Sequence, residues 1–399
     1  GRVALCDLAK SGLRERMEAY LDNAATTRVS EAAAAKALEA MTDHFGNPSS
    51  LHHKGVEAEQ YIRGTRETVS RILRVQPEQI VFTSGGTEAD NLALLGHLRS
   101  RRKPGRVLIS SVEHPAVSGC AEEIRRMGHT VTEIPACAAG SVDLEKLSAL
   151  LDEDVLLISV MQVNNETGAA EPLADIAALR NRLALRAAIH VDGVQGFLRM
   201  NPDFNRLGIQ SYALSGHKIH ALKGTGALII RNDHPIRPLM YGGGQEGNLR
   251  SGTENTLGIL ALGEAVRTWD VTAVDRMRQL KNRLRSALLA RIPEARVNGP
   301  AEGVNTCAPH ILNLSLTPVR SQTMLFALEG DGVYVSAGSA CASRKQKISP
   351  VLRAMGVSTE QADCALRFSL SPLTTEAEID YAATCVVKHW ETLKAYTRR

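Results

Sequence analysis

Residues 187–218, AAIHVDGVQGFLRMNPDFNRLGIQSYALSGHK, contain two apolar, strand-like runs that each end in a polar cluster. The first run closes with VDGVQ at 191–195, and the second closes with SGHK at 215–218. Apolar runs that alternate with helix-like stretches are typical of a mainly parallel sheet covered by helices on both faces. Ligands of such sheets bind beyond the carboxyl ends of the strands. The two clusters therefore predict one shared site.

The alternation of strand-like and helix-like stretches extends on both sides of this segment. We expect an α/β fold whose large domain covers residues 30–272. Its further strands are expected at 79–83, 106–110, 130–134, 154–163 and 226–230, and its helices include 144–151 and 174–185.

The pattern changes near residue 273. Residues 273–399, together with 17–29, are expected to form a smaller α+β domain. Its predicted elements are a helix at 276–290, strands at 310–316 and 332–335, and helices at 361–365 and 375–394. Residues 1–16 precede the structured pattern, and we expect them to be an N-terminal extension, a vector-derived remnant being one explanation.

Composition excludes several classes of protein. The chain has 399 residues, of which 44% are hydrophobic and 23% charged, as in ordinary globular proteins. Only 4% are aromatic, which argues against stacking platforms for single-stranded nucleic acid. A net charge of +4 spread over this length argues neither for direct nucleic-acid binding nor for a membrane surface. No apolar run is long enough to span a bilayer.

The seven cysteines form neither a disulfide framework nor a zinc-binding pattern. Their number is odd, they are widely spaced, and no pair forms C-x-x-C. A reducing, cytoplasmic location is therefore expected, without a metal site.

Three further polar clusters follow predicted strands. They are SGGTE at 84–88, EHP at 113–115 and NNETG at 164–168. Small residues at the start of a helix let backbone N–H groups approach a phosphate, so the segment around Gly86 and Thr87 could cradle one. A plain turn with Thr87 as helix N-cap explains the same residues.

Lys218 and Asp192 suggest a cofactor. A lysine directly after a buried strand can form a Schiff base with an aldehyde, although a surface loop would also accommodate it. An Asp at the end of an apolar strand needs a partner, which can be a pyridinium nitrogen or the backbone of a capped helix. Pyridoxal 5′-phosphate requires three such groups together: a cradle for its phosphate, a carboxylate for its ring nitrogen and a lysine for its aldehyde.

At this point the chain resembles the NifS/IscS-type cysteine desulfurases. The resemblance runs from about residue 19 to residue 383, and its motifs occur in the family's order. They are YLDNAATT, FGNPSSLHHKG, FTSGGTEADN, VEHPAV, VNNETG, VDGVQ, SGHK, GGGQEGNLRSGTENT, SAGSACAS and LRFSL. This implies the fold-type-I architecture of pyridoxal phosphate enzymes, similar to aspartate aminotransferase, and a homodimer.

The resemblance also implies a role for each matching residue. Lys218 would form the Schiff base, Asp192 would pair with the pyridinium, and His114 would stack on the ring and assist proton transfer. Gln195 and Asn165 would lie at the phenolate oxygen, Asn165 also near the substrate carboxylate. The phosphate would be held by Gly86, Thr87, Ser215, His217 and, from the partner subunit, Thr253. Arg367 would bind the substrate carboxylate, and Asn47 would orient the substrate.

Cys341 lies in the Gly/Ser/Ala-rich run VSAGSACAS, a composition that favours a flexible loop. It aligns with the persulfide-forming cysteine of the family, although a cysteine can also be a small buried hydrophobe. The implied reaction removes sulfur from L-cysteine, releases alanine and leaves a persulfide that is passed to an acceptor protein. The basic run at 344–347 is either a solvated loop or a docking site for an acidic acceptor or a protein that works on nucleic acid.

The sequence leaves the pathway and two other functions open. The sulfur could serve iron–sulfur clusters, tRNA thiolation or DNA phosphorothioation. A selenocysteine lyase would share the cofactor residues and a comparable cysteine. A non-catalytic scaffold protein with this fold would not need Lys218, Asp192, His114 and Cys341 together.

Overall fold

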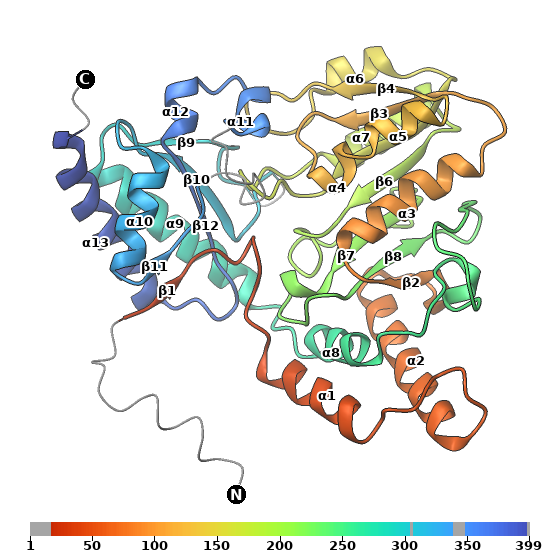
Figure 1. Cartoon of the computed structure of the whole chain (residues 1–399). Coiled ribbons are helices and arrows are strands. Elements are labelled where there is room, and N and C mark those ends of the chain that lie inside the picture. Colours follow the sequence, from red (N-terminus) through yellow and green to blue (C-terminus); the bar gives the residue numbers. More distant parts are fainter. Residues whose placement is uncertain (1–16, 304–305, 338–347, 397–399) are drawn as a thin grey trace, which may run out of the picture.

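The computed structural model describes residues 17–303, 306–337 and 348–396 and confirms the expected α/β fold (Figure 1). A seven-stranded sheet forms the centre of the larger part, in the order β2-β8-β7-β6-β5-β3-β4. Neighbouring strands are parallel except at β8, which is antiparallel to both β2 and β7. The strands are β2 (Ile80–Thr83), β3 (Arg106–Ser110), β4 (Thr130–Ile134), β5 (Val155–Met161), β6 (Ala188–Asp192), β7 (Ser211–Ser215) and β8 (Gly226–Ile230).

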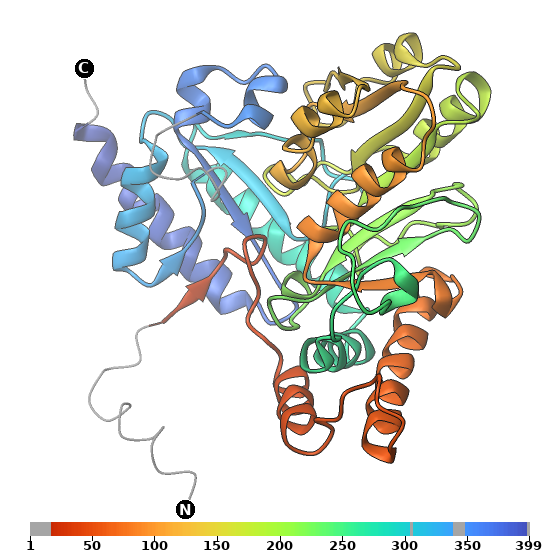
Figure 2. The ribbon, with the colours of Figure 1, turned by 45° about the vertical axis from the view of Figure 1, so that its right-hand side comes forward.

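Helices cover both faces of this sheet because both faces are apolar. Leu108 and Ile158 face a core shared with α1, α2 and α6–α8, whereas Val107 and Leu157 face one shared with α3–α5. Figure 2 shows the two helical layers from another side. The helices are α1 (Glu31–Thr42), α2 (His53–Leu73), α3 (Gly86–Arg99), α4 (Pro115–Ser118), α5 (Ala121–Arg126), α6 (Leu144–Leu150), α7 (Leu173–Leu183) and α8 (Thr256–Arg267), with 3₁₀ turns η1 (Pro77–Gln79), η2 (Gly216–Lys218) and η3 (Glu246–Asn248).

A second core lies among the C-terminal elements. A three-stranded antiparallel sheet, β12-β10-β9, packs with a two-stranded parallel pair, β1-β11. Leu21, just after β1, shares this core with Phe368 and Trp390, so the start of the described chain joins its end. The elements are β1 (Ala19–Tyr20), α9 (Ala273–Arg291), β9 (Arg296–Val297), β10 (Ile311–Ser315), α10 (Ser321–Gly330), β11 (Val333–Tyr334), α11 (Pro350–Ala354), α12 (Thr359–Asp363), β12 (Ala365–Ser369), α13 (Glu376–Leu393) and η4 (Lys394–Tyr396).

One predicted element of this part is misplaced. The helix expected at 361–365 lies at Thr359–Asp363, where the Ser358 hydroxyl caps it by accepting from the N–H of Gln361. Ala365 begins β12 instead, because residues 365–369 are all buried and pair with β10. A short apolar run can be a helix or a strand by periodicity alone, and here the sheet partner decides.

Within the described ranges, no helix combines the length and the apolar composition needed to cross a bilayer.

Candidate active site

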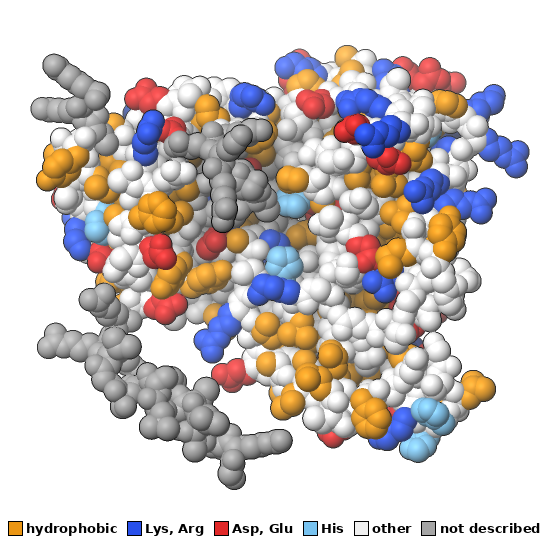
Figure 3. All heavy atoms as spheres, viewed as in Figure 1, with side chains coloured by type: hydrophobic (Ala, Val, Ile, Leu, Met, Phe, Trp, Pro, Cys, Tyr) orange, Lys and Arg blue, Asp and Glu red, His pale blue; other side chains and the backbone are white. Residues whose placement is uncertain are grey.

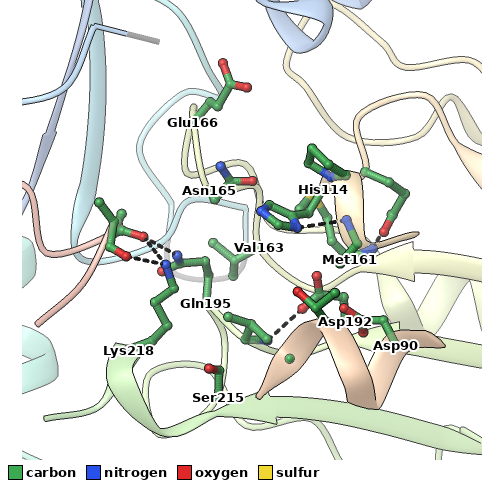
Figure 4. Close-up of a pocket in the computed structure, with 18 of the residues that line it drawn as sticks. Asp90, His114, Met161, Val163, Asn165, Glu166, Asp192, Gln195, Ser215 and Lys218 are labelled. Atoms are coloured by element: carbon green, nitrogen blue, oxygen red, sulfur yellow. Dashed lines mark hydrogen bonds between the residues drawn. The ribbon is translucent and has the colours of Figure 1, made fainter. Parts of the chain in front are cut away.

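A pocket of about 380 Å³ lies where the carboxyl ends of the central strands face the second core. Met161, Asp192 and Ser215, which end β5, β6 and β7, all line it (Figure 4). The opposite wall comes from the segment after β1, from α11 and from β12. Ten residues singled out from the sequence line this one pocket: Gly86, Thr87, His114, Asn165, Asp192, Gln195, Ser215, His217, Lys218 and Arg367.

The N-terminus of α3 opens into the pocket without a side-chain cap. Its N-cap is Gly85, at a φ of 151°, and no side chain of the described residues caps the helix by accepting from its first N–H groups, so the alternative with Thr87 as N-cap is wrong. A Cβ added to Gly86 would lie 2.7 Å from Cγ2 of Val194, so the backbone there lies too close to its neighbour for a side chain. Bare N–H groups and the helix dipole favour an anion, and this end of the pocket fits a phosphate.

His217 also lines the pocket. Its Nδ1 is 3.2 Å from the hydroxyl Oγ1 of Thr26. Burial, with help from Lys218 and Lys223, lowers the pKa of His217 to about 4. The imidazole is therefore neutral near pH 7 and can offer one uncharged hydrogen bond in the pocket that Ser215 and Thr87 also line.

Asp192 ends β6 as a buried carboxylate with few partners. Its Oδ1 accepts a hydrogen bond of 2.9 Å from the N–H of Val194. Burial raises the pKa of Asp192, although this bond, His114 and Lys218 pull it down. A cationic N–H in the pocket would offset the burial of this charge, which is what a pyridinium ring nitrogen supplies.

His114 is held as a neutral donor above the pocket. It is the N-cap of α4, and its Nδ1 accepts from the N–H of Ala116 at 3.1 Å. Burial lowers the pKa of His114. Because Nδ1 accepts, the remaining proton of the neutral ring must sit on Nε2.

Lys218 and Gln195 meet at the segment that follows β1. The Nζ of Lys218 donates to the carbonyl oxygens of Ala24 and Ala25, each at 2.7 Å. Gln195 donates its amide Nε2 to the same Ala24 oxygen at 2.9 Å. A lysine head group thus lies inside the pocket, held by backbone carbonyls, rather than in a solvated loop.

Arg367 projects from β12 with only 2% of its side chain exposed. One terminal nitrogen donates to the carbonyl oxygen of Asn165 at 2.9 Å, and the other to Oδ1 of Asp22 at 2.7 Å. Nε has no partner within the described residues. The guanidinium therefore retains donor capacity for a carboxylate in the pocket. Asp22 is part of the quoted YLDNAATT motif, but the sequence alone did not indicate this contact.

Two predicted site residues that the structure describes, Asn47 and Thr253, do not line the pocket of this chain. Asn47 is exposed and accepts from the N–H of Ser49, and Thr253 is exposed in the segment before α8. Cys341 and the basic run at 344–347 lie outside the described residues. Among the residues that are described, no group of three or more His, Cys, Asp or Glu could hold a metal ion.

The family model for class-V aminotransferases matches residues 19–382. A protein named cysteine desulfurase from Trichormus azollae is 38% identical over 380 residues, covering 94% of each chain. The cysteine desulfurase IscS of an Escherichia coli strain is 39% identical over 383 residues, covering 94% of this chain and 93% of the relative.

Solved structures agree with these relatives. A NifS-like protein superposes with a TM-score of 0.88 at 33% identity, covering 94% of this chain and all of its own. DndA from Streptomyces lividans superposes with a TM-score of 0.72 at 35% identity, covering 88% of this chain and 99% of its own.

Proposed function

We propose that the pocket binds pyridoxal 5′-phosphate, since the chain belongs to the class-V aminotransferase family and is a cysteine desulfurase. One observation carries this proposal. An uncapped helix N-terminus, a buried carboxylate and a lysine amine converge in one pocket of suitable size.

Each part of the cofactor has a matching group. The α3 N-terminus at Gly86 and Thr87, with Ser215 and His217, would hold the phosphate. Asp192 would hold the ring nitrogen, and Lys218 would hold the aldehyde carbon. Gln195 and Asn165 would lie at the phenolate oxygen, and His114 over the ring. When bound, pyridoxal phosphate supplies an electron sink that makes the α-proton of an amino acid acidic.

The chain's own residues would bind the substrate and transfer its sulfur. Arg367 binds the α-carboxylate of L-cysteine, and the amine of Lys218 takes the α-proton. The Cys341 thiolate attacks the substrate sulfur, the bond between that sulfur and its carbon breaks, and the electron pair stays on the carbon, which is then protonated. L-cysteine and the Cys341 thiol thus become L-alanine and a Cys341 persulfide. The outer sulfur of the persulfide then passes to an acceptor protein.

A second copy of the chain is part of this proposal. Large apolar side chains are exposed along α1, α2 and the turn between them, and Figure 3 shows hydrophobic groups over these helices. They are Leu38, Met41, Phe45, Leu51 and Val56, which we call the α1–α2 surface. Asn47 lies within this segment. In a homodimer that covers the α1–α2 surface, Asn47 and Thr253 would reach the pocket of the second copy.

The free cysteines support a cytoplasmic location within the same proposal. Cys120, Cys137, Cys307, Cys364 and Cys385 all carry free thiols. Such thiols persist best in a reducing compartment.

Borohydride trapping tests the cofactor site directly. The protein is loaded with pyridoxal phosphate, treated with borohydride, digested and mapped by mass spectrometry. We expect one cofactor per chain, fixed on the peptide that contains Lys218. Labelling of other lysines with no modification of Lys218 would contradict the proposed site.

A further inference from the structure

His310 is a buried histidine outside the lining of the pocket, and it contacts Gln195, which lines it. It precedes β10, and its residue surface is 0% exposed. Its ring nitrogen Nε2 lies 3.2 Å from the amide oxygen Oε1 of Gln195. We propose that His310 is a positioning residue that fixes the orientation of the Gln195 amide, so that the amide presents an N–H to the pocket.

The backbone around His310 is anchored from several sides. The carbonyl oxygen of His310 accepts from the N–H of Leu370 at 2.8 Å, next to β12. Two residues earlier, Ala308 donates its N–H to Gly168 at 2.8 Å and accepts from the buried Nζ of Lys281 at 2.7 Å. These bonds tie the segment to the NNETG loop, to β12 and to α9. The imidazole therefore approaches Gln195 from a fixed position.

The direction of the hydrogen bond follows from the groups involved. An amide oxygen can only accept, so the Nε2 of His310 must carry the proton that is shared with Gln195. The other ring nitrogen, Nδ1, is buried and has no partner among the described residues. A charged imidazolium would leave a buried N–H unsatisfied at that position, whereas the neutral ring leaves only an acceptor. Burial and the nearby cations Arg199, Lys281 and Arg367 hold the pKa of His310 well below its usual range.

Fixing the oxygen of Gln195 also fixes its nitrogen. The Nε2 of Gln195 donates one hydrogen to the Ala24 carbonyl at 2.9 Å, and its second hydrogen is available in the pocket that Gln195 lines. If the amide turned over, its oxygen would face the bound phenolate and repel it. This consequence rests on the proposed function, because it requires pyridoxal phosphate with its phenolate oxygen near Gln195.

Three variants separate positioning from general packing. His310→Leu removes the hydrogen-bond donor to Gln195, and His310→Gln keeps an N–H at a similar distance. His97→Leu is the control, because it removes another fully buried imidazole that is distant from His310 in the sequence. Each apoprotein is titrated with pyridoxal phosphate, and the pH midpoint of the visible absorbance of the bound cofactor is then measured. Neither readout depends on turnover.

We expect His310→Leu to bind the cofactor about fivefold more weakly, because the loss of one neutral hydrogen bond has an effect of this size. The pH midpoint should rise by about half a unit, because a phenolate without the Gln195 donor holds the proton on the Lys218 nitrogen more tightly. His310→Gln and His97→Leu should match the wild type in both measurements. An unchanged midpoint in His310→Leu, or equal shifts in the Leu and Gln variants, would overturn the inference.

The tautomer of His310 gives a test that needs no cofactor. In apoprotein with ¹⁵N-labelled histidine, the signal that disappears in His310→Gln identifies this ring. We expect the neutral form with the proton on Nε2 throughout the range from about pH 6 to about pH 8. A charged ring or a proton on Nδ1 would overturn the positioning role. Wild-type protein that binds no pyridoxal phosphate would instead overturn the proposed function, while the tautomer still decides the contact with Gln195.

Discussion

The pocket and the α1–α2 surface differ in how completely one chain builds them. Ten of the thirteen residues singled out from the sequence line the pocket, and all of these except Arg367 lie at the end of a strand of the large sheet or within four residues after it. By contrast, Asn47 lies in the exposed segment between α1 and α2, beside Phe45, which is 68% exposed. Thr253 is exposed as well. The pocket is organised within one chain, whereas the apolar side chains of the α1–α2 surface are left exposed by the part of the chain that the structure describes.

The pocket residues depend on folding, whereas Asn47 and Thr253 depend on the proposed assembly. Parallel strands end at the same sheet edge, so residues that follow them are brought together by the fold itself. If a second copy covers the α1–α2 surface as proposed, the residues on this surface act only after association. Variants in the pocket should therefore affect chemistry at unchanged assembly, and variants on the α1–α2 surface should affect assembly first.

The largest effect is expected inside the pocket. Lys218→Ala removes both the group that holds the cofactor and the base, so desulfuration of L-cysteine should fall by roughly three orders of magnitude or more. The proposed dimer should be unaffected, which size-exclusion chromatography with light scattering measures. Lys223→Ala, an exposed lysine in the following turn, is the matched control and should keep wild-type activity. Equal losses in the two variants would refute the assignment of Lys218.

A smaller effect is expected when the α1–α2 surface is disrupted. Phe45→Asp places a charge within the proposed dimer contact and should yield monomers. Their activity should fall by about tenfold at most, because Asn47 and Thr253 would no longer reach a partner. Analytical ultracentrifugation measures the association state. Phe326→Asp is a matched control, because Phe326 is 69% exposed but lies on α10, away in the chain from α1 and α2. If only Phe326→Asp dissociates the protein, the interface lies elsewhere.

The smallest effect concerns stability at acidic pH. His97, on α3, is buried and its pKa is lowered to about 3, whereas His53 at the start of α2 is exposed. Below a pH of about 6.5 the unfolded chain takes up a proton that folded His97 does not, so the free energy of unfolding falls as pH falls. From about pH 7 to about pH 5 this loss is about 2 kcal/mol for His97 alone.

Urea unfolding of the apoprotein at several pH values measures this loss. His97→Gln should show a shallower decline with falling pH than the wild type, and His53→Gln should show the same decline as the wild type. A His97→Gln variant that retains the full wild-type decline would show that this buried imidazole does not titrate as described.

Much of this fold and site could be predicted from the sequence, and the exceptions have physical causes. The sequence indicated that Asp192 and Lys218 would line one site, because VDGVQ and SGHK both follow predicted strands and such strand ends are local signals. The prediction of Thr87 as N-cap was wrong, because the N-cap of α3 is Gly85, two residues earlier, at a φ that glycine adopts readily. The contact between Gln195 and His310 joins segments 115 residues apart, so no local pattern could indicate it.

The most direct test of the account is a single turnover with L-cysteine, followed by quantification of alanine and mass-spectrometric mapping of persulfides on all seven cysteines. We expect one alanine per chain and a persulfide on the peptide that contains Cys341. Cys341→Ser should retain the cofactor but form neither product at the wild-type rate. Alanine release with no persulfide on Cys341, or wild-type sulfur release from Cys341→Ser, would contradict it.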